Sequence, residues 1–117
     1  MSYVDGFVAA VPVANREIYL QHCTEAAEVF REHGALRVVE CWQDDVPHGK
    51  LTDFFMAVKA SEDEAILFSW IEWPSKEARD AGWAAVIADP RMDPAKKPMP
   101  FDGKRMIYGG FAPLLDA

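Results

Sequence analysis

The chain has 117 residues, 50% of them hydrophobic and four of them tryptophan, which fits one folded domain over residues 1–117 and excludes a disordered chain. A net charge of -7 argues against a nucleic-acid binder and against binding to an anionic membrane surface, so neither partner is expected. The two cysteines make no disulfide framework, and no signal peptide or bilayer-spanning run is found, so we expect a cytoplasmic protein.

The first part of the chain predicts a strand, a helix and a second strand. Residues 3–11 alternate with the period of a strand. Asn15 is placed to cap a helix over residues 16–33, where an apolar stripe repeats at helical spacing and Gly34 follows as a left-handed C-terminal cap. Residues 35–44 predict the second strand.

The middle of the chain predicts a further strand and helix. Residues 52–60 fit either a short edge strand or two turns of helix, because their few apolar residues match both periods. Residues 65–73 are apolar with little alternation, which predicts a strand covered on both faces. Ser75 caps a helix that runs to Ile87 or Ala88. A glycine inside this helix, Gly82, predicts close packing of the helix on the sheet.

The last part of the chain predicts a long loop and a final strand. Residues 89–103 carry four prolines and no periodic pattern, and loops of this length are often functional. Residues 104–112 predict the last strand. The resulting order is typical of the ferredoxin-like βαββαβ arrangement, an α+β fold with two helices on one face of an antiparallel sheet. Its strands are expected in the spatial order last, first, third, second.

The sheet face away from the helices is predicted to be aromatic. Because side chains alternate along a strand, one face is expected to carry Tyr3, Asp5, Phe7, Val38, Glu40, Trp42, Phe68, Trp70, Glu72, Met106 and Tyr108. The opposite set is expected beneath the helices: Val4, Val8, Val39, Cys41, Leu67, Ser69, Ile71, Ile107 and Phe111. A β-bulge in any one strand would exchange the residues of that strand between the two faces of the sheet. Since a monomer rarely exposes so large an apolar face, we expect a homodimer joined face to face, a dimeric α/β barrel.

Three residues of the expected dimer cavity are candidates for proton transfer. Asp5 and Glu72 are predicted near one end of the sheet, and two carboxylates in an apolar setting raise the pKa of at least one of them. Tyr108, from the strand beside Asp5, can donate a hydrogen bond to a bound carbonyl or oxyanion. The structural alternative is that each carboxylate is paired with arginine or lysine or is solvated at the rim.

Five further residues are candidates for ligand binding, and these are Glu40, Trp42, Trp70, Arg91 and Lys104. The first three are expected in the cavity wall. The other two belong to a locally basic loop, residues 89–105, which is expected to cover the cavity and meet an anionic group. A solvated loop held by Arg–Asp pairs explains the same pattern. No histidine or cysteine spacing suits a metal, so neither a metal nor a cofactor is expected.

The chain resembles the small bacterial YbaA-like proteins, a family classed as a domain of unknown function. The stretches that carry the resemblance are YVDGFV (3–8), EHGALRVVECW (32–42), DDVP (44–47), FSWIEWPSK (68–76), RDAG (79–82), DPRM (89–92) and MPFDGKRMIYGGF (99–111). The resemblance implies a ferredoxin-like domain of the dimeric α/β-barrel superfamily, and it implies no established activity.

The sequence is compatible with two functions, and it does not decide whether the protein is an enzyme. The first is a protein that binds or converts a small molecule in the aromatic cavity of the homodimer. The second is a non-catalytic stress or interaction protein whose sheet face serves only as a dimer interface. The volume of the cavity distinguishes the two.

Overall fold

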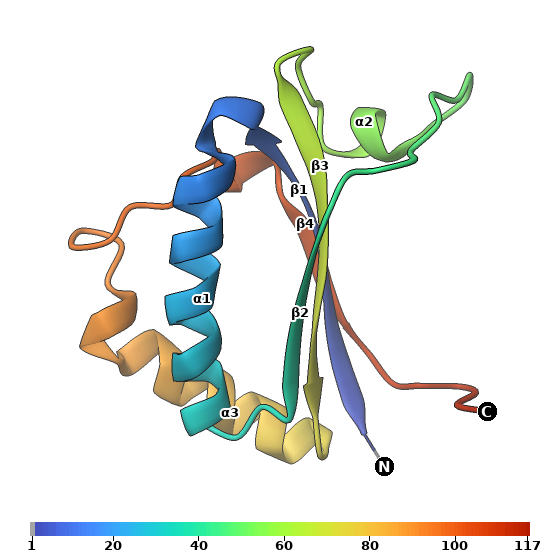
Figure 1. The fold of residues 1–117 in the computed structure, drawn as a ribbon. Coiled ribbons are helices and arrows are strands. Elements are labelled where there is room, and N and C mark those ends of the chain that lie inside the picture. The colour runs from blue at the N-terminus through green and yellow to red at the C-terminus, as the bar shows by residue number, and fades with distance from the viewer. Residues whose placement is uncertain (1) are drawn as a thin grey trace.

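A four-stranded antiparallel sheet with two long helices on one face forms the computed structural model, which describes residues 2–117 (Figure 1). Its elements are β1 (Tyr3–Pro12), α1 (Arg16–Glu32), β2 (Arg37–Trp42), the single turn α2 (Phe54–Ala57), β3 (Glu64–Trp73), α3 (Lys76–Ala88) and β4 (Ile107–Phe111). Short 3-10 turns lie at Val13–Asn15, Pro90–Met92 and Gly103–Arg105.

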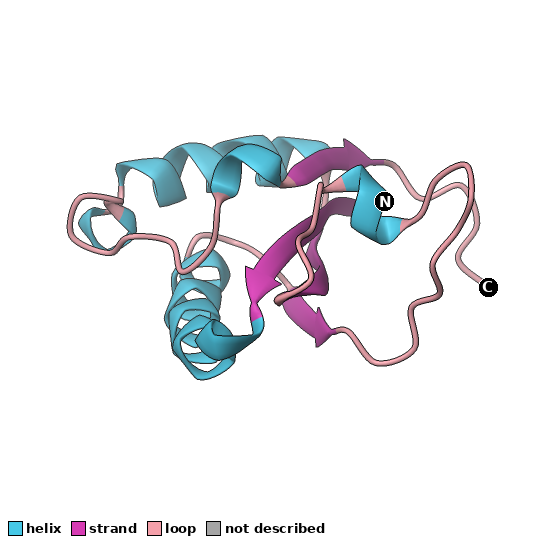
Figure 2. Ribbon diagram, turned by 90° about the horizontal axis from the view of Figure 1, so that it is seen from above, coloured by secondary structure: helices cyan, strands magenta, loops and turns pink. Residues whose placement is uncertain are grey.

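The strands lie in the order β2-β3-β1-β4, and every neighbouring pair is antiparallel. This confirms the predicted ferredoxin-like order. Seen from above, α1 and α3 gather on one side of the strands, and loop segments extend on the other side (Figure 2). The described chain on its own is therefore an open sheet, and its strands do not close into a barrel.

The local signals at the helix ends are mostly confirmed. Ser75 caps α3, where its Oγ accepts from Ala78 N at 3.0 Å. Gly34 follows α1 with a φ of 110°, in the left-handed region that favours glycine. The ambiguous 52–60 segment is one helical turn, capped by Asp53, whose Oδ1 accepts from Met56 N at 2.6 Å.

Asn15 does not cap α1, contrary to the prediction. The 3-10 turn at Val13–Asn15 runs directly into the helix, so that Arg16 N already donates to Val13 O. The Asn15 side chain makes no cap hydrogen bond, and its Nδ2 donates instead to Pro100 O at 2.8 Å. The residue thus ties the start of α1 to the 89–105 segment.

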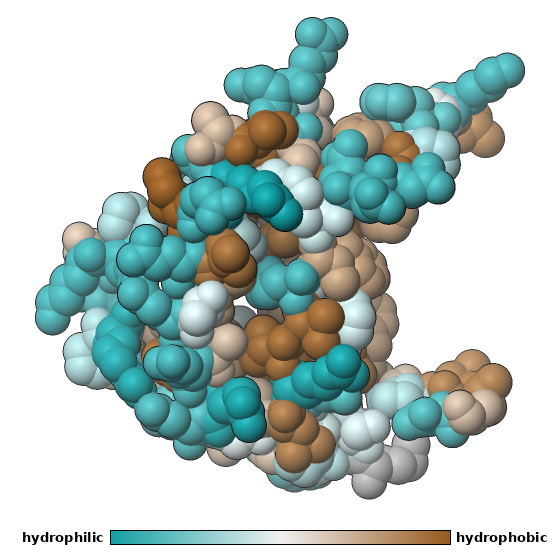
Figure 3. Space-filling model, in the orientation of Figure 1, coloured by the Kyte–Doolittle hydropathy of each residue, from teal (hydrophilic) through white to brown (hydrophobic). Residues whose placement is uncertain are grey.

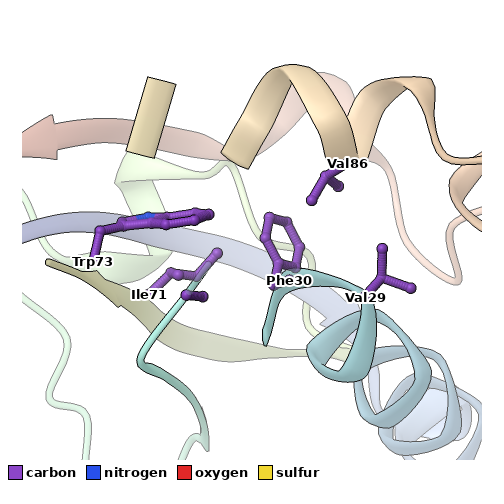
Figure 4. Packing of buried hydrophobic residues seen from close by; sticks show 6 residues of the cluster. Val29, Phe30, Ile71, Trp73 and Val86 are labelled. Atoms are coloured by element: carbon purple, nitrogen blue, oxygen red, sulfur yellow. The ribbon is translucent and has the colours of Figure 1, made fainter. Parts of the chain in front are cut away.

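The core lies between the sheet and the two long helices. One cluster of its buried residues includes Val29, Phe30, Ile71, Trp73 and Val86 (Figure 4). A Cβ atom at Gly82 would lie 2.3 Å from Trp73 Cζ3 and 2.8 Å from His33 O. Only glycine lets α3 approach β3 so closely, which confirms the close packing predicted for this position.

Side-chain directions in β1 are the reverse of those predicted. Asp5 lies directly opposite Ile71 on β3, and Phe7 lies opposite Ser69. Directly paired residues share a face of the sheet, so Asp5 and Phe7 point toward the helices with Ile71. Val4 and Val8, expected beneath the helices, point to the open face instead.

The same correction applies to β2 and β4, whereas β3 is as predicted. Glu40 pairs with Ser69, Trp42 with Leu67 and Val38 with Ile71, so all three β2 residues lie on the helix face. Tyr108 pairs with Phe7 and takes the same direction. Met106 also packs with a helix-side cluster. The open face is built from Val4, Gly6, Val8, Val39, Cys41, Phe68, Trp70, Glu72, Ile107, Gly109 and Phe111.

Candidate functional site

Asp5 is buried on the helix face, and both of its carboxylate oxygens are occupied. Oδ2 accepts from Trp73 Nε1 at 2.9 Å and from Trp83 Nε1 at 2.8 Å. Arg79 donates from Nη2 to Oδ1 at 2.8 Å, and from Nε to both oxygens. These hydrogen bonds hold the pKa of Arg79 above its usual range. A carboxylate has about four acceptor positions, so this geometry supports the structural alternative for Asp5.

Glu72 and Tyr108, the other two candidates for proton transfer, lie apart from Asp5. Glu72 is on the open face, where its Oε2 accepts from Trp70 Nε1 at 2.9 Å and lies 3.6 Å from Arg37 Nη1. Tyr108 lies on the edge strand β4, mostly exposed, with its ring centroid 6.4 Å from that of Phe7. The sheet separates Glu72 from Asp5, so the three predicted residues do not form one site.

The basic residues of the 89–105 segment are largely held in ion pairs with carboxylates. Arg91 Nη2 donates to Asp89 Oδ2 at 2.7 Å and to Glu32 Oε2 at 2.5 Å. Lys97 pairs with Glu25 on α1. Lys104 is exposed in the middle of the Gly103–Arg105 3-10 turn and lines neither the helix-side cavity nor the concavity of the open face. This arrangement agrees with the alternative of a loop held by ion pairs.

A cavity of about 210 Å³ lies on the helix face of the sheet, beneath α1 and α3. Its apolar lining comes from Phe7, Ala26, Ala27, Phe30, Val38, Ile71 and Trp83, with Met92, Met99 and Phe101 from the 89–105 segment. The space-filling view shows a hollow between the helix layer and the sheet, with hydrophobic atoms on its floor (Figure 3). The 89–105 segment therefore borders a cavity within one subunit.

The polar side chains of this cavity centre on Glu40. Tyr19 Oη donates to Glu40 Oε1 at 2.6 Å, and within residues 2–117 no side chain donates to Oε2. Burial raises the pKa of Glu40, and the Tyr19 hydrogen bond opposes that rise. Burial and the nearby Glu40 carboxylate raise the pKa of the Tyr19 phenol. Glu40 is nevertheless an exposed residue, so its carboxylate lies at the solvent-accessible edge of the cavity.

Two titratable residues on α1, His22 and Cys23, complete the polar part of the lining. Burial, with a smaller contribution from Lys97, lowers the pKa of His22, so its imidazole is neutral at pH 7. Burial raises the pKa of the Cys23 thiol to about 11, which keeps it protonated. Of these four residues, only Glu40 is predicted from the sequence to line a cavity, whereas Tyr19, His22 and Cys23 are not predicted as site residues. The apolar stripe that contains Tyr19 and Cys23 was the available signal.

The open face carries a second, broader concavity of about 770 Å³. It is lined by apolar residues of β1, β3 and β4, including Val4, Phe68, Trp70, Ile107 and Phe111. The chain segment with α2 and the C-terminal segment after β4 both project on this side, one near each end of the sheet (Figure 1). We call these segments, residues 43–60 and 112–117, the two arms.

Neither a metal centre nor a membrane span is found in the described part of the chain. Among residues 2–117, no three His, Cys, Asp or Glu side chains converge where they could hold a metal ion. None of the described helices has the length and apolar composition needed to cross a bilayer.

The sheet order and the position of the helices define a ferredoxin-like α+β protein. The fold is similar to that of a dimeric ferredoxin-like protein from an uncultured marine organism, with a TM-score of 0.57 over 99% of this chain and 98% of the other, at 10% sequence identity. The chain belongs to the family described as proteins of unknown function, DUF1428, whose family model matches residues 2–103. This confirms the resemblance to YbaA-like proteins.

The relatives are similar along their whole length. Uncharacterized protein YbaA of Escherichia coli strain K12 is 59% identical over 116 residues, which cover 99% of each chain. The protein of the same name from Shigella flexneri matches to the same extent.

Proposed function

We propose that the protein is a homodimer in which each subunit binds a small molecule in the cavity between its sheet and its helices. The observation that carries this proposal is the Tyr19–Glu40 pair at the solvent-exposed edge of a largely apolar lining. A carboxylate placed among apolar groups costs free energy unless it is well partnered. Asp5 has such partners and is buried, whereas Glu40 accepts from Tyr19 alone among the side chains of residues 2–117 and is exposed at the cavity edge, where a ligand can reach its carboxylate. Ligand sites typically combine apolar walls with a few such polar groups.

Binding is better supported than conversion. The Cys23 thiol, with its pKa near 11, and the Tyr19 phenol, with its raised pKa, both remain protonated at neutral pH. Neither is an activated nucleophile. The proposed role of the cavity is therefore recognition of a ligand, with Glu40 as its main polar contact.

The homodimer is supported by the open face and the two arms. Phe68, Ile107 and Phe111 are 45%, 46% and 62% exposed on this one apolar face. A monomer rarely leaves such a patch uncovered, and a second copy of the same face is the simplest cover. The arms carry Leu51 and Leu115, which are 97% and 83% exposed and could pack against a partner subunit. The similar marine protein is described as dimeric, which supports the same assembly.

A thermal-shift screen of a broad small-molecule library tests the proposed binding. A ligand at 100 times its dissociation constant stabilises a protein by about 2.7 kcal/mol, enough to raise the melting temperature measurably. Ala27→Leu, which adds a side chain to the cavity wall, should remove the shift of any compound that binds there. The binding proposal fails if no compound shifts the wild type, or if every shift persists in this variant.

The second candidate is an interaction protein whose sheet face serves only as a dimer interface. The broad apolar concavity of the open face favours it, because an interface alone explains that surface. A stable dimer together with a negative ligand screen would support this function.

A further inference from the structure

We infer that the ligand of the helix-side cavity is a single-ring phenol whose hydroxyl group donates a hydrogen bond to Oε2 of Glu40. This inference rests on the proposed function and names its ligand class. Three features of the cavity lead to it: its volume, the aromatic rings that line it, and the Glu40 carboxylate oxygen that accepts from no side chain of residues 2–117.

The volume of the cavity restricts the ligand to about one ring. The cavity measures about 210 Å³. An engineered protein cavity of roughly 150 Å³ with an apolar lining holds one benzene molecule. The additional volume here accommodates a few substituent atoms, whereas most of a large cofactor or nucleotide would lie outside the cavity.

The walls favour an aromatic ring over an aliphatic chain of the same size. At one side, the rings of Phe30 and Trp83 meet edge to face, with centroids 4.9 Å apart at 77°, and Phe7 lies 6.3 Å from Trp83. At the other side, Tyr19 and Phe101 lie 5.8 Å apart. Rings arranged in this way present both edges and faces, and an added ring gains specific contacts from them.

The polar side of the cavity selects an uncharged donor. Tyr19 occupies Oε1 of Glu40, so Oε2 is the acceptor that a ligand can reach. A carboxylate or phosphate ligand would be repelled by Glu40. An ammonium ligand would be attracted by Glu40, but its charge would remain at the exposed edge beside this carboxylate and would gain little from the apolar interior of the cavity. A phenol brings one donor and no charge.

Ser69 supplies a partner for the phenol oxygen. It lies directly opposite Glu40 on β3 and lines the same cavity. A serine hydroxyl can donate as well as accept. A phenol between these residues can therefore donate to Glu40 and accept from Ser69, which satisfies its hydroxyl group on both sides.

Titrations with three matched fluorinated probes, followed by ¹⁹F NMR at pH 7, test this inference. The probes are 4-fluorophenol, fluorobenzene and 4-fluorobenzoate, which differ only in the group that would meet Glu40. We expect 4-fluorophenol to bind about tenfold or more tightly than fluorobenzene, because a hydrogen bond to a charged acceptor is among the stronger ones. We expect no binding of 4-fluorobenzoate.

Glu40→Gln should keep the shape of the cavity and remove the charged acceptor. The advantage of 4-fluorophenol over fluorobenzene should then fall below about threefold, while the affinity for fluorobenzene stays unchanged. Glu28→Gln, the same substitution on the exposed side of α1, should preserve the full advantage. Ala27→Leu, an independent variant, should abolish binding of both probes even if Glu40→Gln fails to fold.

The possible failures are distinguishable. Equal or tighter binding of fluorobenzene or 4-fluorobenzoate overturns the ligand class but leaves a binding cavity. An advantage of 4-fluorophenol that persists in Glu40→Gln overturns the role of Glu40. If none of the probes binds, the phenol inference is wrong, and the proposed function is then decided by the broad screen alone.

Discussion

Arg79 on the first turn of α3 donates from Nη2 to Oδ1 of Asp5 near the start of β1, at 2.8 Å. The Asp5 side chain is only 4% exposed, and two indole N–H groups, from Trp73 and Trp83, complete its hydrogen bonds. One carboxylate thereby joins the central strand, its neighbour β3 and the helix that covers them. An aspartate in an apolar strand is thus explained by the tertiary structure without a ligand.

Asp5→Asn should destabilise the fold by about 3 kcal/mol, because removing one partner of a buried ion pair leaves the other without compensation. Chemical denaturation measures this loss. Asp80→Asn, which removes the exposed second partner of Arg79, is the matched control and should cost at most about 1 kcal/mol. If Asp5→Asn instead stays within about 1 kcal/mol of the wild-type stability and abolishes ligand binding, the structural explanation is wrong and Asp5 has the predicted role in the site.

Gly82→Ala should destabilise the protein despite the better helix propensity of alanine. The propensity gain is about 1 kcal/mol, whereas the added Cβ would lie 2.3 Å from Trp73 and 2.8 Å from the His33 carbonyl oxygen. Overpacking of this kind costs about 1–3 kcal/mol and occasionally more, and the backbone carbonyl cannot turn away. Thermal unfolding should show a lower melting temperature, and an unchanged or higher one would contradict the packing described for α3.

A fall in pH should weaken the ion pair that joins Arg105, just before β4, to Glu64 at the start of β3. Arg105 donates to both oxygens of Glu64, whose side chain is 6% exposed, and lowers the pKa of that carboxyl from 4.5 to about 2. Because the folded pKa lies below the unfolded one, this stabilisation is complete above about pH 5 and is lost as the pH falls toward 2.

Glu64→Gln tests this pH dependence. The free energy of unfolding, measured by denaturant titration from pH 7 to pH 3, should fall less steeply below pH 5 in this variant than in the wild type. Glu62→Gln, an exposed neighbour, should keep the wild-type slope. Parallel curves for Glu64→Gln and wild type would show that the pair contributes no pH-dependent stability.

The open face should hold two subunits together. Light scattering at micromolar concentration is expected to give the mass of a dimer for the wild type. Trp70→Asp places a charge on the open face and should give monomer or aggregate, since an unpaired charge in an interface is costly. Ile18→Asp, a similar change at an exposed position of α1 on the helix side, should leave the dimer intact. A monomeric wild type would rule out the proposed assembly.

Much of the candidate site could not be predicted from the sequence pattern, because it depends on contacts between elements that are distant in the chain. Glu40 was predicted to line a cavity, and it does line one, but within a single subunit. Its partner Tyr19 belongs to α1, whose packing over β2 brings the two side chains within 2.6 Å. Asp5 and Glu72 were predicted as neighbours because both lie in strands that pair, and the pairing places them on opposite faces.

The sequence by itself determined the order and type of the main elements, because the signals for them are local. Ser75, Gly34 and the prolines act through the backbone of their own neighbourhood, and periodicity marks each strand and helix. Only the tertiary structure decided which side of each strand faces the helices. β1 is apolar on both sides, with Phe7 on one and Val8 on the other, so alternation alone does not choose between them. The hydrogen-bond register between strands distant in the chain makes that choice, and a shift of one residue would exchange the two faces.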